Sequence, residues 1–595
     1  MKDFSCGEIN AKHIDQPMTL SGWVQYRRDH GGVIFVDLRD HTGFVQIVFN
    51  PDEKNAFSVA ESLRAEACIT VTGQVCARSK ETINKNIPTG EVELVANSVQ
   101  LHNLAQPIPF SIDDHQTASE ETRLKSRFLD LRRPKMQHNL RLRARLNNAL
   151  RKHLIQENFI EVETPILTKP TPEGARDYLV PSRTQQGHCF ALPQSPQVLK
   201  QILMVSGFDR YYQIVRCFRD EDLRADRQPE FTQLDLEMAF VDQKDVMNTV
   251  EKLVLNTCQD LGVELPSPFP KLSYQEVMDR FGSDKPDLRN PLELKRADTL
   301  FEKSAFNVFK DPSCKDKHRV SLLNVPGGVE KLSRKKIDEY THLVSKFGAK
   351  GLAYIKVNNK DDITNGLQSP LLKFLSTDEL KGILTLSNSN NGDIIFFGAG
   401  HDDVVSQSLG ILRDTIGKDL SLIQNGWKPL WVIDWPMFEV SQDQSGQKVQ
   451  ALHHPFTAPD VENVETFKKD PFKCITKAYD LVLNGFEVGG GSIRNHQLDM
   501  QYAVMSVLGL EKEEVDAQFG HLMSALSFGA PPHGGIALGL DRLAMLLCEA
   551  DSIRDVIAFP KTQNARCLLT EAPANANPEQ YLELGISINQ TIEDN

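Results

Sequence analysis

The segment "FRDEDLRADRQPEFTQLD", residues 218–235, places dense charge between two apolar stretches. It holds three arginines and six carboxylates, with "YYQIV" before it and "LEMAF" after it. The runs "RYYQIVRCF" (210–218) and "EFTQLDLEMAF" (230–240) predict two strands of an antiparallel hairpin. A solvated surface loop is one explanation of the charge. An anion site is the other, because Arg219 at the end of a strand can hold a phosphate through its fork of N–H donors.

The composition excludes several classes of protein. A chain of 595 residues predicts about three to five domains, and 40% apolar with 25% charged residues is typical of globular proteins. The net charge of −13 means that any RNA binding must depend on local basic patches. The ten cysteines form no Cys-x-x-Cys pair, so we expect neither zinc nor a disulfide framework. Neither a signal peptide nor a membrane span is recognisable, which predicts a cytoplasmic protein without a membrane partner.

The first hundred residues alternate between apolar and polar side chains in five short runs. Such a pattern predicts a small closed barrel of the OB type, a common binder of single-stranded nucleic acid. The proline-containing "AQPIPFSIDDHQT" that follows reads as a linker. Leucines then recur every fourth residue from Leu142 to Leu154, which predicts a helix beginning near Asn139. "NFIEVETPIL" (158–167) and "LWVIDWPMFEV" (430–440) each predict a strand.

The segment "YDLVLNGFEVGGGSIR" (479–494) brings two carboxylates to one hairpin. The "LNG" turn would let Asp480 and Glu487 converge from adjacent strands, as Mg²⁺ beside a triphosphate requires. Arg494 emerges next to the glycine-rich floor of this hairpin. Ordinary hairpin glycines and a surface arginine are the alternative.

The segment "GGIALGLDRLAML" (534–546) predicts a glycine-rich strand that feeds a helix near Gly539. Arg542 would lie in the first turn, beside the positive end of the helix dipole, where an anion would meet both. The alternative is a buried strand–helix corner stabilised by Asp541 and Arg542. The segment does not match the Walker pattern, so it is not a P-loop.

Three stretches together resemble the three motifs of class II aminoacyl-tRNA synthetases. They are "ETPILTKPTPEGARDYLVPSR", "FRDEDLRADRQPEFTQ" and "GLDRLAML". In their order and over essentially the whole length, the chain resembles the bacterial type of aspartyl-tRNA synthetase. This resemblance implies a multidomain α+β fold, with an N-terminal OB-fold β-barrel, an antiparallel-sheet catalytic domain and an inserted α/β domain. The implied parts are the anticodon-binding barrel at 1–105, a linker at 106–118, the catalytic domain at 119–290 and 425–560, the insertion at 291–424 and a C-terminal extension at 561–595.

The resemblance implies a reaction in two steps. L-aspartate is activated with ATP to aspartyl-adenylate, and the aspartyl group is then transferred to the 3′ end of tRNA. ATP is a substrate, Mg²⁺ is required and zinc is not. A homodimer is implied, built on the first motif around the Leu142–Leu154 helix and Pro165.

The resemblance also implies roles for residues at the active site. Arg219 and Arg542 would be catalytic, and Asp480 and Glu487 would hold Mg²⁺. ATP would contact Arg219, Asp220, Glu221, Gln228, Phe231, Glu487, Gly539, Leu540, Asp541 and Arg542, with Phe231 stacked on adenine. Aspartate would contact Glu173, Gln197, Lys200, Arg219, Asp235, His453 and Arg494.

In the barrel, the resemblance places the tRNA anticodon against Arg28, His30, Phe35 and Gln46. Phe35 could instead belong to the barrel core, because the sequence does not fix the register. His30, followed by two glycines, resembles enzymes that charge both tRNA-Asp and tRNA-Asn, although "HGG" could simply be a hairpin turn. A second determinant is expected near residues 80–83. The alternatives are a strictly discriminating enzyme, an asparaginyl or lysyl type, an amide ligase without tRNA and a non-catalytic RNA-binding paralogue.

Overall fold

The computed structural model describes residues 3–114, 118–170, 175–221, 226–443 and 446–587. The chain divides into two compact units. One comprises Met1–Ala144, Asp222–Pro229 and Ala544–Tyr581, and the other comprises Arg145–Glu221, Glu230–Leu543 and Leu582–Asn595. In these described ranges, no helix combines the length and the apolar character that crossing a bilayer would require.

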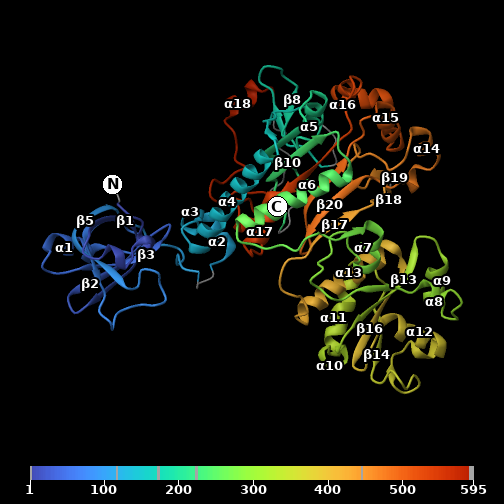
Figure 1. The fold of residues 1–595 in the computed structure, drawn as a ribbon, viewed down its shortest axis with the longest axis horizontal. Helices are drawn as coiled ribbons and strands as arrows, with labels where there is room; N and C mark the ends of the chain where they lie inside the picture. The colour runs from blue at the N-terminus through green and yellow to red at the C-terminus, as the bar shows by residue number, and fades with distance from the viewer. Residues whose placement is uncertain (1–2, 115–117, 171–174, 222–225, 444–445, 588–595) are drawn as a thin grey trace. The chain divides into compact units, whose positions relative to one another are not determined.

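A closed five-stranded barrel forms the N-terminal part of the first unit (Figure 1). Its strand order is β1-β2-β3-β5-β4, so the prediction of an OB-type barrel is confirmed. Alternation puts the side chains of Ile34, Val36 and Leu38 in the core, while Phe35 between the first two is half-buried. A helix, α1 (Lys54–Ser62), was not predicted, because its ends have no side-chain cap. The strands are β1 (Pro17–His30), β2 (Val33–Asp40), β3 (Gly43–Phe49), β4 (Cys68–Ala77) and β5 (Val92–Asn103).

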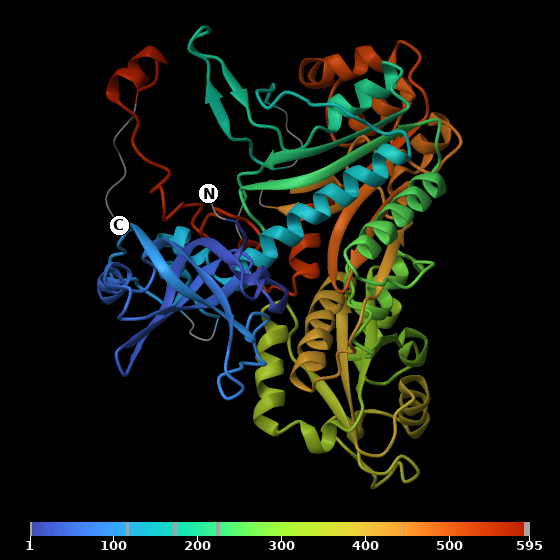
Figure 2. The same ribbon diagram turned by 60° about the vertical axis from the view of Figure 1, so that its left-hand side comes forward.

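An eight-stranded sheet forms the centre of the second unit (Figure 2). The predicted hairpin is present, with β9 (Arg210–Phe218) antiparallel to β10 (Glu230–Ala239). The strand order is β11-β17-β20-β21-β22-β10-β9-β6. The remaining strands are β6 (Ile160–Glu161), β11 (Lys271–Ser273), β17 (Pro429–Ile433), β20 (Ala478–Leu483), β21 (Phe486–Ile493) and β22 (His533–Gly539).

Three predicted elements differ in extent from those observed. The strand expected at 158–167 is reduced to β6, because Pro165 cannot donate to a strand ladder. The strand expected at 430–440 splits into β17 and β18 (Phe438–Asp443), since Asp434 adopts a φ of 57° and a proline follows at 436. The helix α4 (Pro134–Gln156) begins before Asn139, at a proline that suits a first helical position.

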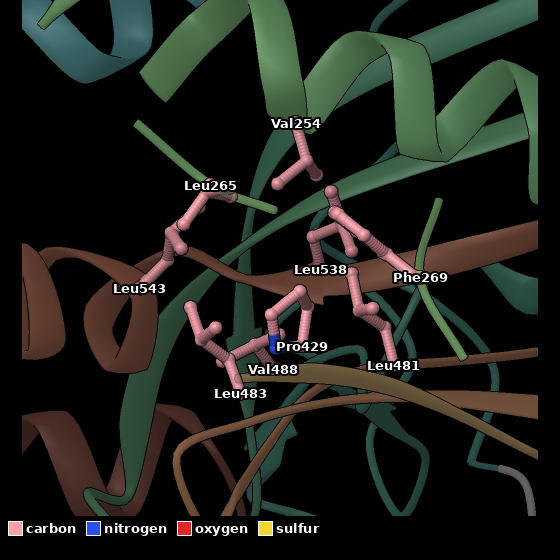
Figure 3. A pocket seen from close by; sticks show the side chains of 9 residues that line it. All are labelled: Val254, Leu265, Phe269, Pro429, Leu481, Leu483, Val488, Leu538 and Leu543. Carbon is pink, nitrogen blue, oxygen red and sulfur yellow. The ribbon is translucent and has the colours of Figure 1, made fainter. Parts of the chain in front are cut away.

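One face of the eight-stranded sheet is an apolar core covered by α6 (Gln243–Asp260). Val254 of this helix faces Leu481, Leu538 and other apolar side chains across a cavity of about 10 Å³ (Figure 3). A cavity of this size has room for about one water molecule, so it is not a substrate site. Any polar site on this sheet must therefore lie on its opposite face.

A second, five-stranded sheet lies within the segment expected to be an insertion. Its order is β12-β13-β16-β14-β15. Helices α11 (Arg334–Ser345) and α13 (Asp402–Asp419) pack apolar side chains against it, which gives the mixed α/β character that was predicted. The strands are β12 (Leu294–Arg296), β13 (His318–Val325), β14 (Ala353–Val357), β15 (Leu367–Gln368) and β16 (Asp393–His401).

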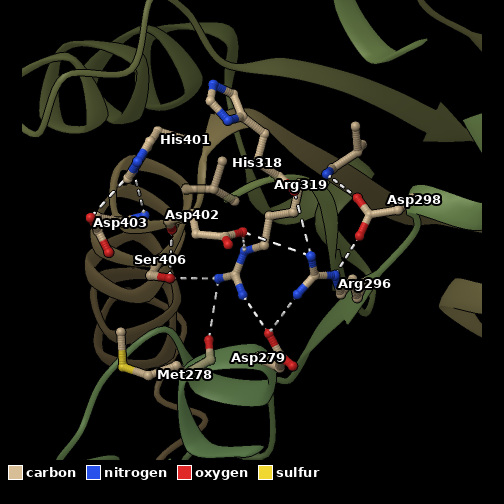
Figure 4. Close-up of polar contacts among 12 residues, drawn as sticks. Met278, Asp279, Arg296, Asp298, His318, Arg319, His401, Asp402, Asp403 and Ser406 are labelled. Atoms are coloured by element: carbon tan, nitrogen blue, oxygen red, sulfur yellow. Dashed lines mark hydrogen bonds and ion pairs between the residues drawn. The ribbon is translucent and has the colours of Figure 1, made fainter. Parts of the chain in front are cut away.

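The buried side chain of Arg319 connects this sheet to helix α7 (Tyr274–Phe281) through hydrogen bonds (Figure 4). Arg319 of β13 donates to Asp279 of α7 at 2.7 Å and to Ser406 of α13 at 2.7 Å. Arg296 of β12 reaches the same carboxylate at 3.4 Å. Arg319 is 1% exposed, so the loss of Asp279 would leave a charge buried beside a poorer set of partners.

Candidate active site

Strand register gathers the polar side chains on one face of the eight-stranded sheet. Asp480 pairs with Gly490, Gly490 with Ala537, and Ala537 with Asp235. Directly paired residues share a face, so Asp480 of β20 and Asp235 of β10 point to the same side although β21 and β22 lie between their strands. Ser492 and Glu237 lie two residues after Gly490 and Asp235 on their strands, so they face that side too.

Two carboxylates converge above Gly490, as the hairpin pattern predicted. A bulge between Leu481 and Val482 puts Glu487 on the face that carries Asp480. A Cβ on Gly490 would lie 3.0 Å from Asp480 Oδ1 and 3.5 Å from Glu487 Oε1, so glycine leaves the space between them open. Burial raises the pKa of Asp480 to about 6, His453 opposes this shift from 3.0 Å, and the negative charges of Glu487 and Asp284 add to it.

The third motif forms a strand–helix corner at the edge of this acidic site. Helix α17 (Leu540–Leu547) begins directly after β22, so Gly539 and Leu540 form the junction. Asp541 Oδ2 accepts a hydrogen bond from the backbone N–H of Thr232 at 2.8 Å. Arg542 Nη1 donates to the carbonyl oxygen of Glu487 at 2.9 Å. The corner therefore positions Arg542 beside the carboxylates.

Arg219 and Phe231 face each other at the open end of the β9–β10 hairpin. The guanidinium carbon lies 5.2 Å from the centre of the ring, within cation–π range. Arg219 Nε is buried and has no hydrogen-bond partner among the residues that the structure describes. A buried donor of this kind suits an anionic ligand. Asp220 forms a bridge with Arg176 through its backbone N–H.

A buried network of four charges lies on the same face. Lys200 of α5 (Gln197–Val205) donates to Asp235 Oδ1 at 2.9 Å and lies 3.4 Å from Glu237 Oε2. Arg494 meets Glu237 through two bonds, from Nε to Oε1 at 2.9 Å and from Nη2 to Oε2 at 3.2 Å. Burial alone would raise the pKa of Glu237, but Arg494 and Lys200 hold it below its usual value. None of the four side chains is more than 3% exposed.

Among the buried atoms without partners in the described part of the chain are Gln197 Nε2, Asp235 Oδ2 and His454 Nε2. His454 Nδ1 accepts a hydrogen bond from Phe456 N–H at 3.2 Å, so the neutral ring carries its proton on Nε2. Burial lowers the pKa of His454 well below its ordinary value, and the positive charge of Arg494 lowers it further. Gln197 and His454 therefore offer two hydrogen-bond donors, and Asp235 offers one acceptor, to a polar ligand at this face.

Most of the predicted active-site residues that the structure describes belong to the second unit. Gln228 belongs to the first unit, where its amide accepts from Lys561 N at 2.7 Å and donates to Lys561 O at 3.0 Å. Glu173 lies outside the described residues. The predicted residues in the second unit are Gln197, Lys200, Arg219, Asp220, Glu221, Phe231, Asp235, His453, Asp480, Glu487, Arg494, Gly539, Leu540, Asp541 and Arg542.

Sequence reasoning missed four side chains in this site: Glu237, His454, Ser492 and Asp284. Strand alternation was the available signal for Glu237, which lies two residues after Asp235 and so shares its face. The same rule links Ser492 to Arg494. His454 and Asp284 lie outside strands, and no periodic pattern could have assigned them to the site.

The four candidate anticodon residues lie on the outer surface of the barrel. Phe35 pairs with Arg28 and is half-buried, while its neighbours in β2 fill the core, so the alternative of a core phenylalanine is wrong. Gln46 donates to Glu93 Oε2 at 2.9 Å. The ring of His30 lies 6.3 Å from that of Phe35. A stacking surface and hydrogen-bonding groups are thus side by side, as single-stranded nucleic acid requires.

The family of the chain follows from sequence comparison. A model described as tRNA synthetases class II (D, K and N) matches residues 119–563, which is most of the chain. The chain belongs to this family. A second model, an OB-fold nucleic acid binding domain, matches residues 18–101 of this class II synthetase.

Relatives and solved structures agree with this assignment. The synthetase is 51% identical over 593 residues to the aspartate–tRNA(Asp/Asn) ligase of Legionella pneumophila strain Philadelphia 1, covering all of both chains. It is 52% identical, with the same coverage, to the ligase of that name from strain Paris. Its fold is similar to that of asparaginyl-tRNA synthetase from Pyrococcus horikoshii complexed with asparaginyl-adenylate (TM-score 0.58, 20% identity, 94% of this chain and 98% of that chain). The asparaginyl-tRNA synthetase of Entamoeba histolytica gives a TM-score of 0.57 at 17% identity, with 94% and 98% coverage.

Proposed function

We propose that this class II synthetase is an aspartate–tRNA ligase, which forms aspartyl-adenylate from L-aspartate and ATP and transfers the aspartyl group to tRNA. The observation that carries the proposal is the buried network of Lys200, Asp235, Glu237 and Arg494. Arg494 and Lys200 offer cationic donors to the substrate side-chain carboxylate. Asp235 Oδ2 is an acceptor for the α-ammonium group.

Activation requires no nucleophile from the protein, because the α-carboxylate of aspartate attacks the α-phosphate of ATP. Arg219, whose Nε lacks a partner in the described chain, would donate to the α-phosphate as its negative charge grows. Arg542 would hold the outer phosphates, and Phe231 would stack on adenine. Placement and charge stabilisation are then the main sources of rate acceleration.

Asp480 and Glu487 would hold Mg²⁺ with the phosphates. The fit is supported by two carboxylates that meet above Gly490, since oxygen ligands are those that Mg²⁺ prefers. Within the described ranges no group of three His, Cys, Asp or Glu side chains could bind a metal ion alone. Magnesium usually keeps waters and substrate phosphates as its remaining ligands. When bound, the ion would neutralise charge on the phosphates.

Asparagine is the competing substrate to be rejected, because it matches aspartate in shape. Its uncharged amide would leave donors of Arg494 without an anionic partner in a buried site. The loss of hydrogen bonds to a charged group costs about 1.5–3 kcal/mol. Selection for aspartate over asparagine therefore rests on the N–H donors of Arg494 and Lys200.

We also infer that the enzyme charges tRNA-Asn as well as tRNA-Asp. His30 and its two following glycines support this inference, together with the Asp/Asn specificity in the names of the Legionella relatives. Gly31 and Gly32 both have positive φ, at 63° and 88°, as a two-residue hairpin turn demands. The turn thus accounts for the glycines, and His30 is left exposed at its edge. A strictly discriminating enzyme is the alternative.

A homodimer is proposed on the first motif. Leu146, Leu150 and Leu154 are buried within the chain, so they cannot form the contact surface. Four apolar side chains in the segment that leads past Pro165 are between 45% and 62% exposed, and exposed apolar side chains of this kind suit contact with a second copy: Ile155, Ile160, Ile166 and Leu167. Sedimentation should show a dimer, and a fully active monomer would contradict it.

The experiment that tests the catalytic assignment is aspartate-dependent exchange of pyrophosphate into ATP. Arg219→Ala and Arg542→Ala should each reduce exchange by at least about a hundredfold, because each removes a charged donor to the phosphates. Arg216→Ala is the matched control, since this arginine lies on β9 three residues before Arg219, but its side chain is 44% exposed and paired with Glu230. Near-normal exchange in both test variants would contradict the assignment.

A further inference from the structure

Arg494 is held in a fixed orientation before any substrate arrives. Glu237 takes its Nε–H and one N–H of Nη2, at 2.9 and 3.2 Å. Ser492 Oγ accepts from Nη1 at 2.7 Å, and Ser492 itself receives a hydrogen bond from Thr457 at 3.1 Å. One N–H of Nη1 and one of Nη2 are left over, a pair of donors that suits a carboxylate.

The sheet is built to admit Glu237 at this place. Glu237 pairs with Gly535 of β22, and a Cβ on Gly535 would lie 2.2 Å from Glu237 Oε2. Any other residue at 535 would therefore collide with the carboxylate. The glycine of the third-motif strand makes room for the side chain that orients Arg494 on the neighbouring strand.

The charges of the network are balanced in the empty site. Lys200 and Arg494 supply two positive charges, and Asp235 and Glu237 supply two negative ones, all buried. An entering carboxylate is therefore not held by a surplus of positive charge. It is held by N–H donors whose direction has already been set, which lowers the entropy lost on binding.

We propose that Glu237 is a specificity-determining positioning residue, which orients Arg494 so that its two remaining N–H donors meet the side-chain carboxylate of aspartate. This inference rests on the proposed contact between Arg494 and that carboxylate. Glutamine at 237 has one acceptor and one donor group, so it cannot accept both guanidinium bonds. Aspartate at 237 keeps the charge but is one methylene shorter.

The test measures KM for aspartate and for ATP separately in pyrophosphate exchange. Glu237→Gln and Glu237→Asp should each raise KM for aspartate by about tenfold or more, while KM for ATP stays within about twofold, since a hydrogen bond to a charged group is lost only at the amino-acid site. The preference for aspartate over asparagine should fall in both variants. Because charge is retained in Glu237→Asp, its loss of affinity separates orientation from charge.

Ser492→Ala provides a milder variant that introduces no charge change. It removes the second anchor of Arg494, and KM for aspartate should rise by about threefold or more, again without a change in KM for ATP. Glu66→Gln is the matched control, because Glu66 is a buried glutamate that accepts two bonds from Arg39 in the barrel, at 2.9 and 2.8 Å. It should leave both KM values unchanged.

The outcomes distinguish this inference from the proposed function. If Arg494→Lys leaves KM for aspartate unchanged, the contact assigned to Arg494 is wrong. If Arg494→Lys raises it while Glu237→Asp and Ser492→Ala do not, the contact stands and the positioning role of Glu237 is overturned. Equal increases in KM for aspartate and ATP in the Glu237 variants would indicate a merely structural role and would also overturn the inference.

Discussion

The guanidinium of Arg219 lies over the ring of Phe231, 5.2 Å from its centre, at the end of the β9–β10 hairpin. This contact constrains the arginine without using its hydrogen-bond donors. The ring therefore has two roles in the proposed site, as a surface for adenine and as a support for Arg219.

Replacement of Phe231 by leucine should impair both roles. A cation–π contact is worth about 0.5–2 kcal/mol, so we expect exchange to fall by roughly twofold to thirtyfold, with a rise in KM for ATP. Pyrophosphate exchange at varied ATP concentration measures both. Phe190→Leu is the control, since Phe190 is 40% exposed on the hairpin of β7 (Leu179–Pro181) and β8 (Cys189–Ala191). Unchanged ATP kinetics in Phe231→Leu would remove Phe231 from the site.

The pKa of His454 predicts how stability depends on pH. Because burial lowers the pKa of this ring in the folded protein, the unfolded chain binds more protons below about pH 6.5. Folding stability should therefore be fully present above that pH and fall as the pH drops, by up to about 1.4 kcal/mol per unit. His454→Gln should flatten the dependence of the thermal midpoint between pH 7.5 and 5.

The shifts of His533 and His496 have the same sign, so some slope should remain in His454→Gln. The exposed His41 offers a control, and His41→Gln should leave the slope as it is. If His454→Gln gives the wild-type slope, the ring is not held neutral by its surroundings.

The buried arginine of the five-stranded sheet predicts a local stability defect. Asp279→Asn weakens the partner of Arg319, which is 1% exposed, and of Arg296. We expect a loss of about 1.5–3 kcal/mol in unfolding free energy, measured by urea denaturation, because hydrogen bonds to charged groups are worth this much. Asp470→Asn, which breaks an exposed pair with Lys473, should cost at most about 1 kcal/mol. Equal small effects would show that the network contributes little.

His30 predicts the range of tRNAs that are charged. Aspartylation of unmodified tRNA-Asp and tRNA-Asn transcripts should differ by no more than about tenfold, because the anticodons differ at one pyrimidine only and the glycine turn beside His30 can adapt to either. In that case, His30→Leu should widen the difference. A preference for tRNA-Asp of about a thousandfold or more would leave the strictly discriminating enzyme as the better account.

Much of the fold could be predicted from local patterns, and the reason is visible in particular strands. β9 and β10 were predicted nearly residue by residue, because long apolar runs with clear breaks specify strands strongly. The segments near Pro165 and Pro436 are as apolar as strands, but a proline has no N–H to donate, so the strand hydrogen bonds end there. Composition alone does not carry that information.

The active site was less predictable, because its geometry depends on pairing between distant strands. Asp480 and Glu487 were expected to converge, since one short turn joins their strands. Glu237 was missed, although it completes the same face, because its partner Arg494 is far away in sequence. Contacts of this kind follow from register across β10, β22 and β21, which no local pattern fixes.

The central claim is that the site selects aspartate, and exchange of pyrophosphate with each of the twenty amino acids tests it most directly. We expect exchange with L-aspartate alone, dependent on Mg²⁺, with asparagine lower by at least about tenfold because its amide cannot accept from both remaining N–H donors of Arg494. Equal or greater exchange with asparagine or lysine, or none with any amino acid, would contradict it.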